Sequence, residues 1–286
     1  MIKKLFSLLI SVLLITSLSI SVFAADSSGE VITPIKENTV VVNEYELSKE
    51  LSFKSDSKLS DMGYSSSDIA GIRDYHQKYV DHLNGLKELS DSTLASQGYT
   101  SEQIAVLRNF DGSEAQASLL SATLTISSST SNFRYVDTYS KGKLSYSWSW
   151  AGVPAFKMKD AVAASWNDWA VESNTSNVKY YNVNTGSYYS QSTATFTTDG
   201  NGTEGAGHKF NVSMSDNYYY AKSGSGTFNI RSDVHAVKDF YYYLAYGHSE
   251  LLPTINFSIG VGGASGSISF TSGTVILDED TGNYIF

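Results

Sequence analysis

"GYSSSDIAGIRDY" (residues 63–75) and "GYTSEQIAVLRNF" (residues 98–110) are two versions of one stretch, and this repetition decides the fold of the N-terminal third of the chain. When residues 51–75 are aligned with residues 86–110, eleven of 25 positions are identical and no gap is needed. A duplication accounts for this identity. In each copy a glycine takes the left-handed conformation at little cost and so ends a short first helix. The sequence predicts two helix–glycine–helix hairpins.

Capping residues indicate where the helices of each copy begin. Thr100 with Gln103 forms a capping box before the second helix of the later copy, and Ser65 with Asp68 is the weaker equivalent in the earlier copy. Apolar and aromatic residues then recur at helical spacing, at Ile69, Ile72, Tyr75 or His76, Tyr79, Leu83 and Leu86. We expect Asn84-Gly85 to end this helix. Two such hairpins can cover each other's apolar faces.

The first residues predict export. Lys3 and Lys4 precede a long apolar run, and Val22 and Ala24 place small residues where a signal peptidase requires them. We expect a signal peptide over residues 1–24, cleaved after Ala24, rather than an uncleaved membrane helix. The chain has no cysteine, which excludes disulfides and a cysteine nucleophile and indicates an exported protein of a Gram-positive bacterium. The mature protein is expected to be secreted, either released or loosely associated with the cell wall.

The charge balance restricts the possible partners. Removal of the expected signal peptide takes away two lysines and no acidic residue, so the formal net charge changes from −9 to −11. No run of basic residues offsets this charge. The composition therefore argues against nucleic acid and against anionic lipid surfaces.

The segment "MGYSSSDI" (residues 62–69) resembles the helix–MGF/Y–helix turn of ubiquitin-associated domains. This resemblance implies a helix–turn–helix fold and covers the turn with its flanking helices. Ubiquitin is not a partner for an exported bacterial protein, so no binding residue is transferred from that family. Tyr64 and Tyr99, the aromatic residues of the two turns, either form a pair of equivalent partner contacts or pack against their own hairpins, and we favour packing.

The composition changes after residue 118. Fifteen of the 20 tyrosines and all four tryptophans follow, and helical periodicity gives way to alternation of apolar and polar residues. The fold class is therefore predicted as α+β, with a helical repeat followed by an antiparallel β-sandwich, which we favour over a closed barrel. The expected divisions are a signal peptide (1–24), an extended leader (25–48), a helical module (49–112), a linker (113–118) and a β-sandwich (119–286).

Aromatic residues are the best candidates for binding. In "KLSYSWSWAG" (residues 143–152) the aromatic side chains share one face and the serines share the other, which indicates that the aromatics are in the core. Trp166 and Trp169, at a strand end, are candidates for an exposed pair, with packing as the favoured alternative. Consecutive residues of a strand point to opposite faces, so at least one member of each tyrosine triple is expected at the surface. These triples are Tyr218, Tyr219 and Tyr220, and Tyr241, Tyr242 and Tyr243.

Catalytic and metal-binding patterns are weak in this sequence. The five histidines do not form a motif such as HExxH, and neighbours such as His248, Ser249 and Glu250 would point apart along a strand. Three acidic residues, Asp160, Asp168 and Glu172, could in principle supply a carboxylate pair for glycoside hydrolysis. We expect no metal, no cofactor and no catalytic residue.

The sequence supports three classes of function. The leading prediction is non-catalytic binding outside the cell, to cell-wall polymer, polysaccharide or a protein surface. The second is a pore-forming or bacteriocin-like toxin, because "TINFSIGVGGASGSISF" (residues 254–270) has the alternation of a membrane-inserting hairpin. The third is an extracellular hydrolase. The chain resembles exported proteins of Gram-positive bacteria in its general texture. Its oligomeric state is left open, and a membrane partner is expected only for the toxin.

Overall fold

A computed structural model describes the chain between residues 36 and 280, with gaps. The described ranges are 36–61, 64–136, 138–157, 159–166, 168–197, 205–214, 218–232, 240–248, 257–260, 267–270 and 274–280. The expected signal peptide and the first part of the expected leader lie outside these ranges. Contacts group Thr33–Phe286 into one compact unit.

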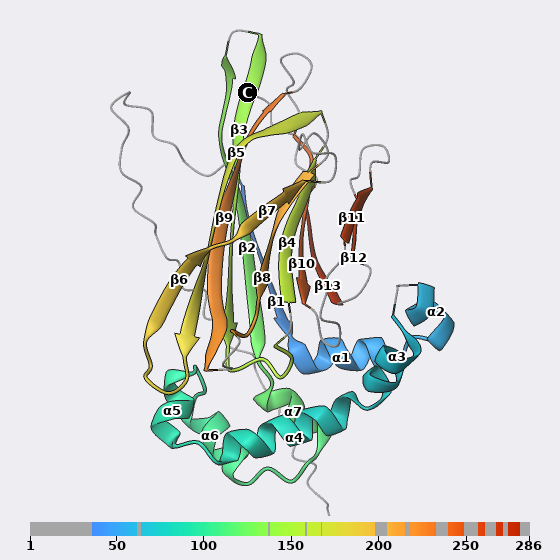
Figure 1. Cartoon of the computed structure of the whole chain (residues 1–286), viewed down its shortest axis with the longest axis vertical. Coiled ribbons are helices and arrows are strands. Elements are labelled where there is room, and N and C mark those ends of the chain that lie inside the picture. The colour runs from blue at the N-terminus through green and yellow to red at the C-terminus, as the bar shows by residue number, and fades with distance from the viewer. Residues whose placement is uncertain are drawn as a thin grey trace, which may run out of the picture. The chain divides into compact units, whose positions relative to one another are not determined.

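The chain is α+β, with a helical region followed by antiparallel sheets, as the sequence predicts (Figure 1). The helices of the described region are α1 (Glu44–Ser52), α2 (Asp56–Asp61), α3 (Ser66–Arg73), α4 (Tyr75–Lys87), α5 (Asp91–Ser96), α6 (Ser101–Arg108) and α7 (Glu114–Leu120). One strand, β1 (Lys36–Asn43), precedes them and pairs with the first strand that follows them. The helical region is thus inserted between two adjacent strands of one sheet.

The duplication is visible in the hydrogen bonds of the two hairpins. Both predicted capping boxes are present, one from Ser65 and Asp68 and the other from Thr100 and Gln103. Arg73 at the end of α3 donates to the carboxylate of Asp56 and to two backbone carbonyls that precede α2. Its counterparts 35 positions later repeat every one of these contacts: Arg108 donates to Asp91 and to the carbonyls of Lys87 and Leu89. The repeat is therefore a conformational unit as well as a sequence pattern.

The two copies do not share one core within the described region. Leu51, Leu59, Tyr64 and Ile72 form a small cluster around the first hairpin. The second hairpin belongs to a larger cluster that includes residues of the β region such as Val153, Tyr181 and Tyr220. The apolar face of the second hairpin is therefore covered by the sheets and the other helices.

Several boundaries differ from the sequence predictions. The helix expected to run from residue 69 to Gly85 is interrupted at Asp74 and continues through Gly85 to Lys87. Gly85 is tolerated there because Leu83 and Leu86 on either side of it are buried, and this packing outweighs the low helix propensity of glycine. The expected linker over 113–118 is mostly the helix α7, and the expected leader over 25–48 includes β1 and the start of α1.

The strands form two main antiparallel sheets. The six-stranded sheet has the order β1-β2-β3-β9-β5-β6, the five-stranded sheet has the order β13-β10-β4-β8-β7, and β11 pairs with β12 alone. Their bounds are β2 (Thr123–Val136), β3 (Tyr139–Ala151), β4 (Lys159–Trp166), β5 (Trp169–Asn182), β6 (Tyr188–Ser192), β7 (Ala194–Thr197), β8 (Gly205–Asn211), β9 (Tyr219–Ser232), β10 (Tyr242–His248), β11 (Phe257–Gly260), β12 (Ser267–Phe270) and β13 (Thr274–Asp280).

The main core lies between the two sheets. The aromatic face of β3 is buried, as the alternation in the sequence predicts, and Trp148 stacks on Phe210 of β8 with ring centroids 4.8 Å apart. Aromatic side chains of both sheets dominate this core, and each buries a large apolar area. The inner faces of the two sheets are therefore joined mainly by ring contacts.

Glycines on β9 make room for these rings. Gly224 and Gly226 lie directly opposite Trp148 and Tyr146 in the β3–β9 register. A Cβ atom at Gly224 would lie 2.6 Å from the Trp148 ring, and one at Gly226 would lie 2.4 Å from the Tyr146 hydroxyl. The absence of a side chain on β9 thus lets the large rings of β3 lie flat against the sheet.

Replacement of Gly224 by alanine should therefore displace Trp148 and lower the free energy of unfolding by roughly 1–3 kcal/mol, the usual cost of overpacking a core. Urea denaturation followed by tryptophan fluorescence measures this change. Ser225→Ala is the matched control, because Ser225 is exposed on the other face of β9, and it should change stability by less than about 0.5 kcal/mol. Equal effects of the two substitutions would contradict the packing described here.

Candidate functional site

A fully buried group of charged residues connects the start of the helical region to the five-stranded sheet. His248, at the end of β10, lies between two carboxylates. Its Nδ1 is 2.9 Å from Oδ1 of Asp160 on β4, and its Nε2 is 3.0 Å from Oε1 of Glu44 at the start of α1. The Tyr246 hydroxyl donates to the other oxygen of Asp160, and the backbone N–H groups of Ala155 and Phe156 donate to Glu44. Every polar atom of the imidazole therefore has a carboxylate partner.

The electrostatics of this group follow from its burial and its pairing. Burial alone would lower the pKa of His248, but the charges and hydrogen bonds of Asp160 and Glu44 raise it well above 6.5. Burial alone would raise the pKa of Glu44, but its bonds to His248 and to the two backbone N–H groups bring it below its ordinary value. We conclude that an imidazolium bridges two carboxylates. Such a bridge holds elements together and leaves no nitrogen free for proton transfer to a substrate.

A second buried histidine is neutral. The Tyr146 hydroxyl is 2.5 Å from Nδ1 of His208, whose Nε2 is 3.3 Å from the amide oxygen of Asn174. Burial lowers the pKa of His208 to about 4. Nε2 therefore carries the proton and donates to Asn174, while Nδ1 accepts from Tyr146. The imidazole stacks on Phe228 with ring centroids 5.0 Å apart, so this chain of hydrogen bonds lies within the core.

The three acidic residues considered for hydrolysis are not brought together. Asp160 is buried and bound to His248, while Glu172 is on the surface and paired with Lys141 at 2.6 Å. Asp168 is exposed in the turn between β4 and β5. No pair of these carboxylates faces a common space in the described region. The pairing of Asp160 with His248 could not be read from the sequence, because it depends on the register of β4 against β10.

The structure distributes the predicted aromatic candidates between the core and the surface. The buried ones are Trp166, Trp169, Tyr220, Tyr242, Tyr64 and Tyr99. Those with intermediate exposure are Tyr219, Tyr241 and Tyr243, and Tyr218 is exposed. An exposed tryptophan pair is therefore absent, since Trp166 and Trp169 pack against Phe228 and Phe240 respectively. Tyr64 packs in its own hairpin, as favoured from the sequence. Tyr99 belongs to the cluster that includes Leu94 and Leu107 of its own hairpin, and its hydroxyl also accepts from the backbone N–H of Val153, just after β3.

Exposed tyrosines lie around the turn between β5 and β6. Tyr188 and Tyr189, which begin β6, are 55% and 49% exposed, and Tyr218 is 51% exposed. The backbone N–H of Val183 in the turn donates to the carbonyl of Tyr218 at 2.9 Å, which fixes the third tyrosine beside the turn. Tyr188 and Tyr189 were missed in the sequence because "SYYS" resembles any short strand. The signal that distinguishes them is their position on β6, a strand at the edge of the sheet.

The turn that carries these tyrosines is held by its own polar residues. The Asn182 side chain accepts hydrogen bonds from the backbone N–H groups of Asn184 and Thr185, and the N–H of Gly186 donates to the Asn182 carbonyl. Behind the turn, the Tyr181 ring contacts Tyr188 at 5.3 Å. The exposed rings are thus supported by an ordered turn and by a buried aromatic side chain, which reduces the entropy cost of binding a ligand.

Replacement of His248 by glutamine should lower the free energy of unfolding by about 3–5 kcal/mol at pH 7, because two buried carboxylates lose their shared cation. The deficit should shrink at pH 5, where one carboxylate of the variant takes up a proton and the uncompensated charge disappears. Urea unfolding of the wild type and the variant at both pH values, followed by circular dichroism, measures this difference in the free energy of unfolding.

The wild-type protein sets the reference for this comparison. The raised pKa of His248 contributes stability that is fully present below pH 6.5 and is lost as the pH rises through the folded-state value. The lowered pKa of Glu44 contributes stability that is present above pH 4.5 and is lost as the pH falls. His82→Gln is the control, since it removes one hydrogen bond to the Val153 carbonyl and should cost about 1 kcal/mol. A His248→Gln deficit that is the same at pH 7 and pH 5 would contradict the bridge.

The described ranges have no helix long and apolar enough to cross a membrane and no cluster of three histidine or acidic side chains that could hold a metal ion. The second finding agrees with the bridge, because both nitrogens of His248 are occupied by carboxylates. No known protein-family model matches the chain, and no curated protein matches it either. The chemistry of its exposed side chains is therefore the basis on which a function can be proposed.

Proposed function

We propose that this is a secreted, non-catalytic protein that binds polysaccharide of the bacterial cell wall through the exposed tyrosines around the β5–β6 turn. The observation that carries the proposal is the presence of three half-exposed rings, Tyr188, Tyr189 and Tyr218, around one ordered turn. A tyrosine ring offers a flat apolar face and a hydroxyl at low conformational cost, a combination suited to the faces and hydroxyls of sugar rings.

The edge position of β6 makes these rings accessible. Strand β6 pairs with β5 alone and all five of its residues are exposed. Tyr188 and Tyr189 are consecutive in this strand, so their side chains point to opposite faces of the sheet. A chain of sugars that runs along the edge can therefore contact one ring on each face.

Polar side chains near the rings supply hydrogen-bonding groups. Thr185 and Ser187 lie in the turn with hydroxyls 2.7 Å apart, and Gln191 is exposed further along β6. The Lys179 ammonium lies 5.7 Å from the Tyr188 ring centroid. Aromatic faces with nearby hydroxyl and amide groups favour a hydroxyl-rich polymer over an apolar protein surface.

The buried histidines favour binding over catalysis. His248 has carboxylates on both nitrogens, and His208 donates to Asn174 and accepts from Tyr146 inside the core. A general base must reach the proton that it removes, and neither imidazole has a free nitrogen at the surface. The proposed activity is therefore recognition without turnover.

Co-sedimentation with purified Gram-positive cell walls tests this proposal, using protein recovered from the culture medium, whose first residue we expect to be Ala25. Tyr188→Ala and Tyr218→Ala should each weaken binding at least tenfold, which corresponds to about 1.4 kcal/mol. Phe53→Ala is the matched control, because Phe53 is a ring that is 77% exposed on the helical region, and it should leave binding unchanged. Recovery of the wild-type protein in the supernatant would refute wall binding.

A second candidate function, membrane insertion as a toxin, is favoured by one observation. The strands β11 and β12 form a separate hairpin, with Phe257 opposite Phe270 and Ile259 opposite Ile268. This hairpin belongs to neither main sheet, so its pairing could lengthen without breaking their order. A strand that spans a bilayer needs about 9–11 residues, more than the four that are paired in each arm here.

Dye release from liposomes distinguishes this candidate from wall binding. Release by the wild-type protein, together with its loss in Ile259→Asp, would support membrane insertion and displace the binding proposal. Intact liposomes at micromolar protein concentrations would eliminate the toxin. We expect intact liposomes, because binding through aromatic rings beside an ordered turn needs no change of fold.

A further inference from the structure

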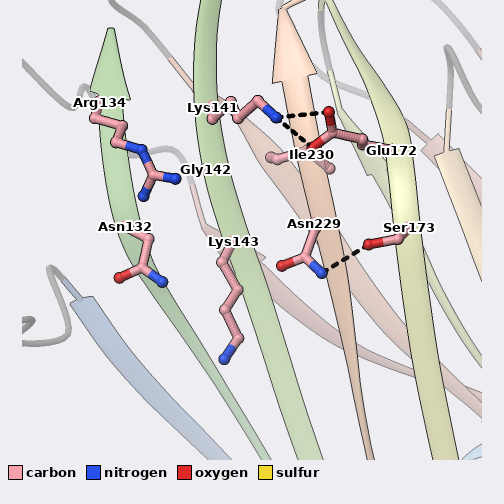
Figure 2. A pocket seen from close by; sticks show the side chains of 9 residues that line it. All are labelled: Asn132, Arg134, Lys141, Gly142, Lys143, Glu172, Ser173, Asn229 and Ile230. Atoms are coloured by element: carbon pink, nitrogen blue, oxygen red, sulfur yellow. Dashed lines mark hydrogen bonds and ion pairs between the residues drawn. The ribbon is translucent and has the colours of Figure 1, made fainter. Parts of the chain in front are cut away.

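The outer face of the six-stranded sheet has a polar hollow far along the sheet from the exposed tyrosines. Figure 2 shows its lining side chains, which extend from β2, β3, β9 and β5. Its volume is about 190 Å³, which is below the roughly 300–1,000 Å³ of pockets that hold drug-sized molecules. The hollow therefore suits a single small polar group.

Two irregularities in the strands shape this hollow. The β2–β3 register shifts between Ser131 and Arg134, where Asn132 has a positive φ of 61°. The β5–β9 register shifts between Val171 and Ser173. These shifts are typical of β-bulges, which bend a strand and re-aim its side chains. The two bulged strands lie on either side of β3 and β9, and residues of all four strands line the hollow (Figure 2).

Positive charges are gathered at this level of the sheet. Arg134 pairs in register with Lys141, and Lys141 pairs with Arg231, so three cationic residues lie side by side on adjacent strands. Lys143, two residues along β3, adds a fourth. Glu172 is the one acidic residue of the lining, and both of its oxygens bind the ammonium of Lys141, at 2.6 and 2.9 Å.

This arrangement leaves positive charge uncompensated. Like charges directly opposite each other on neighbouring strands destabilise a sheet. Arg134 and Lys143 form no ion pair with any carboxylate of the described ranges, and Glu172, the acidic residue of the lining, binds Lys141. An anion in the hollow would therefore relieve a repulsion as well as form new hydrogen bonds.

Hydrogen-bonding groups at the hollow are also unsaturated. Oδ1 of Asn132 is buried and has no hydrogen-bond partner in the described structure. On the opposite side, the amide of Asn229 donates to Oγ of Ser173 at 2.9 Å, which leaves the Ser173 hydroxyl hydrogen free to donate further. Figure 2 shows the Asn132 NH₂ on the side of the amide nearer β3, so groups on both sides of the hollow can donate.

We propose that this hollow binds a phosphate group, with Arg134 and Lys143 as its principal ligands. The guanidinium of arginine donates two parallel hydrogen bonds to an oxyanion, and a lysine adds a point charge. A phosphate has oxygens enough to reach Asn132 and Ser173 as well. The same chemistry is offered by free phosphate and by a phosphate ester of a polymer. The site is separate from the tyrosines of the proposed function and does not depend on them.

The composition of the chain gave no indication of this site. The sequence has no run of basic residues to offset its acidic balance. The lysines and arginines of this patch are separated along the chain, at positions 134, 141, 143 and 231. The β2–β3–β9 register brings them together. A protein of net charge −9 thus has a local basic patch on one face.

Isothermal titration of the purified protein with inorganic phosphate tests the proposal. We expect saturable binding that Arg134→Gln and Lys143→Gln each weaken at least tenfold. Glu172→Gln should strengthen binding several-fold, because it removes the one negative charge and releases Lys141. Lys58→Gln is the charge-matched control, since Lys58 is exposed on α2, and it should leave the affinity within twofold of the wild type.

Parallel titrations distinguish the sources of the anion. Glycerol 2-phosphate tests a phosphate monoester, and galacturonate tests the planar carboxylate of a sugar acid. Binding of both phosphates, with the ester as strong as the free ion, supports a phosphate carried on a polymer, and stronger binding of the free ion supports free phosphate. Absence of saturable binding, tighter binding of galacturonate, or a Lys143→Gln variant that is folded by circular dichroism and binds normally would overturn the proposal.

Discussion

Two carboxylates that share one buried imidazolium hold this fold together. Glu44 begins the first helix, Asp160 lies on β4 and His248 ends β10, so the three charges join the helical region to the second sheet. Burying such charges is costly unless each has partners, and here the imidazole bonds to both acids and the Tyr246 hydroxyl completes Asp160. The bridge is therefore stable as a whole and vulnerable to the loss of any one member.

The same bridge also orders the connection between β3 and β4. The N–H groups of Ala155 and Phe156 lie outside any strand, and buried backbone donors of this kind require an acceptor. Glu44 accepts from both of them at 2.9 and 3.1 Å. One side chain thus satisfies a histidine and two backbone groups, and its negative charge at the first turn of α1 is favourable for the helix dipole.

The six-stranded sheet combines three different surfaces. Its inner face is an aromatic core against the other sheet, and its edge strand β6 exposes rings on both sides. Its outer face between β2 and β5 is polar and cationic. The exposed rings and the polar hollow are both produced by departures from a regular sheet, a short edge strand in the first case and two register shifts in the second.

Local features of the structure were predictable from the sequence, and long-range ones were not. The capping boxes at Ser65 and Thr100 and the buried face of β3 follow from spacing alone. Packing of Trp166 and Trp169 was the favoured alternative, and both are buried, but the partners that bury them, Phe228 and Phe240, could not be read from the sequence. Both candidate binding surfaces require the pairing of strands, which a single sequence does not contain.

The distance along the chain between Glu44 and His248 has a consequence for the order of folding. These two residues are 204 positions apart, and β1 likewise pairs with β2, from which the whole helical region separates it in the chain. Closing so long a loop is slow, and the bridge cannot form before β10, which ends at His248, is available. A chain that is threaded through a membrane N-terminus first would keep its central charge bridge open until nearly all of it had crossed. The charge bridge, and with it the complete fold, would then form on the far side of the membrane.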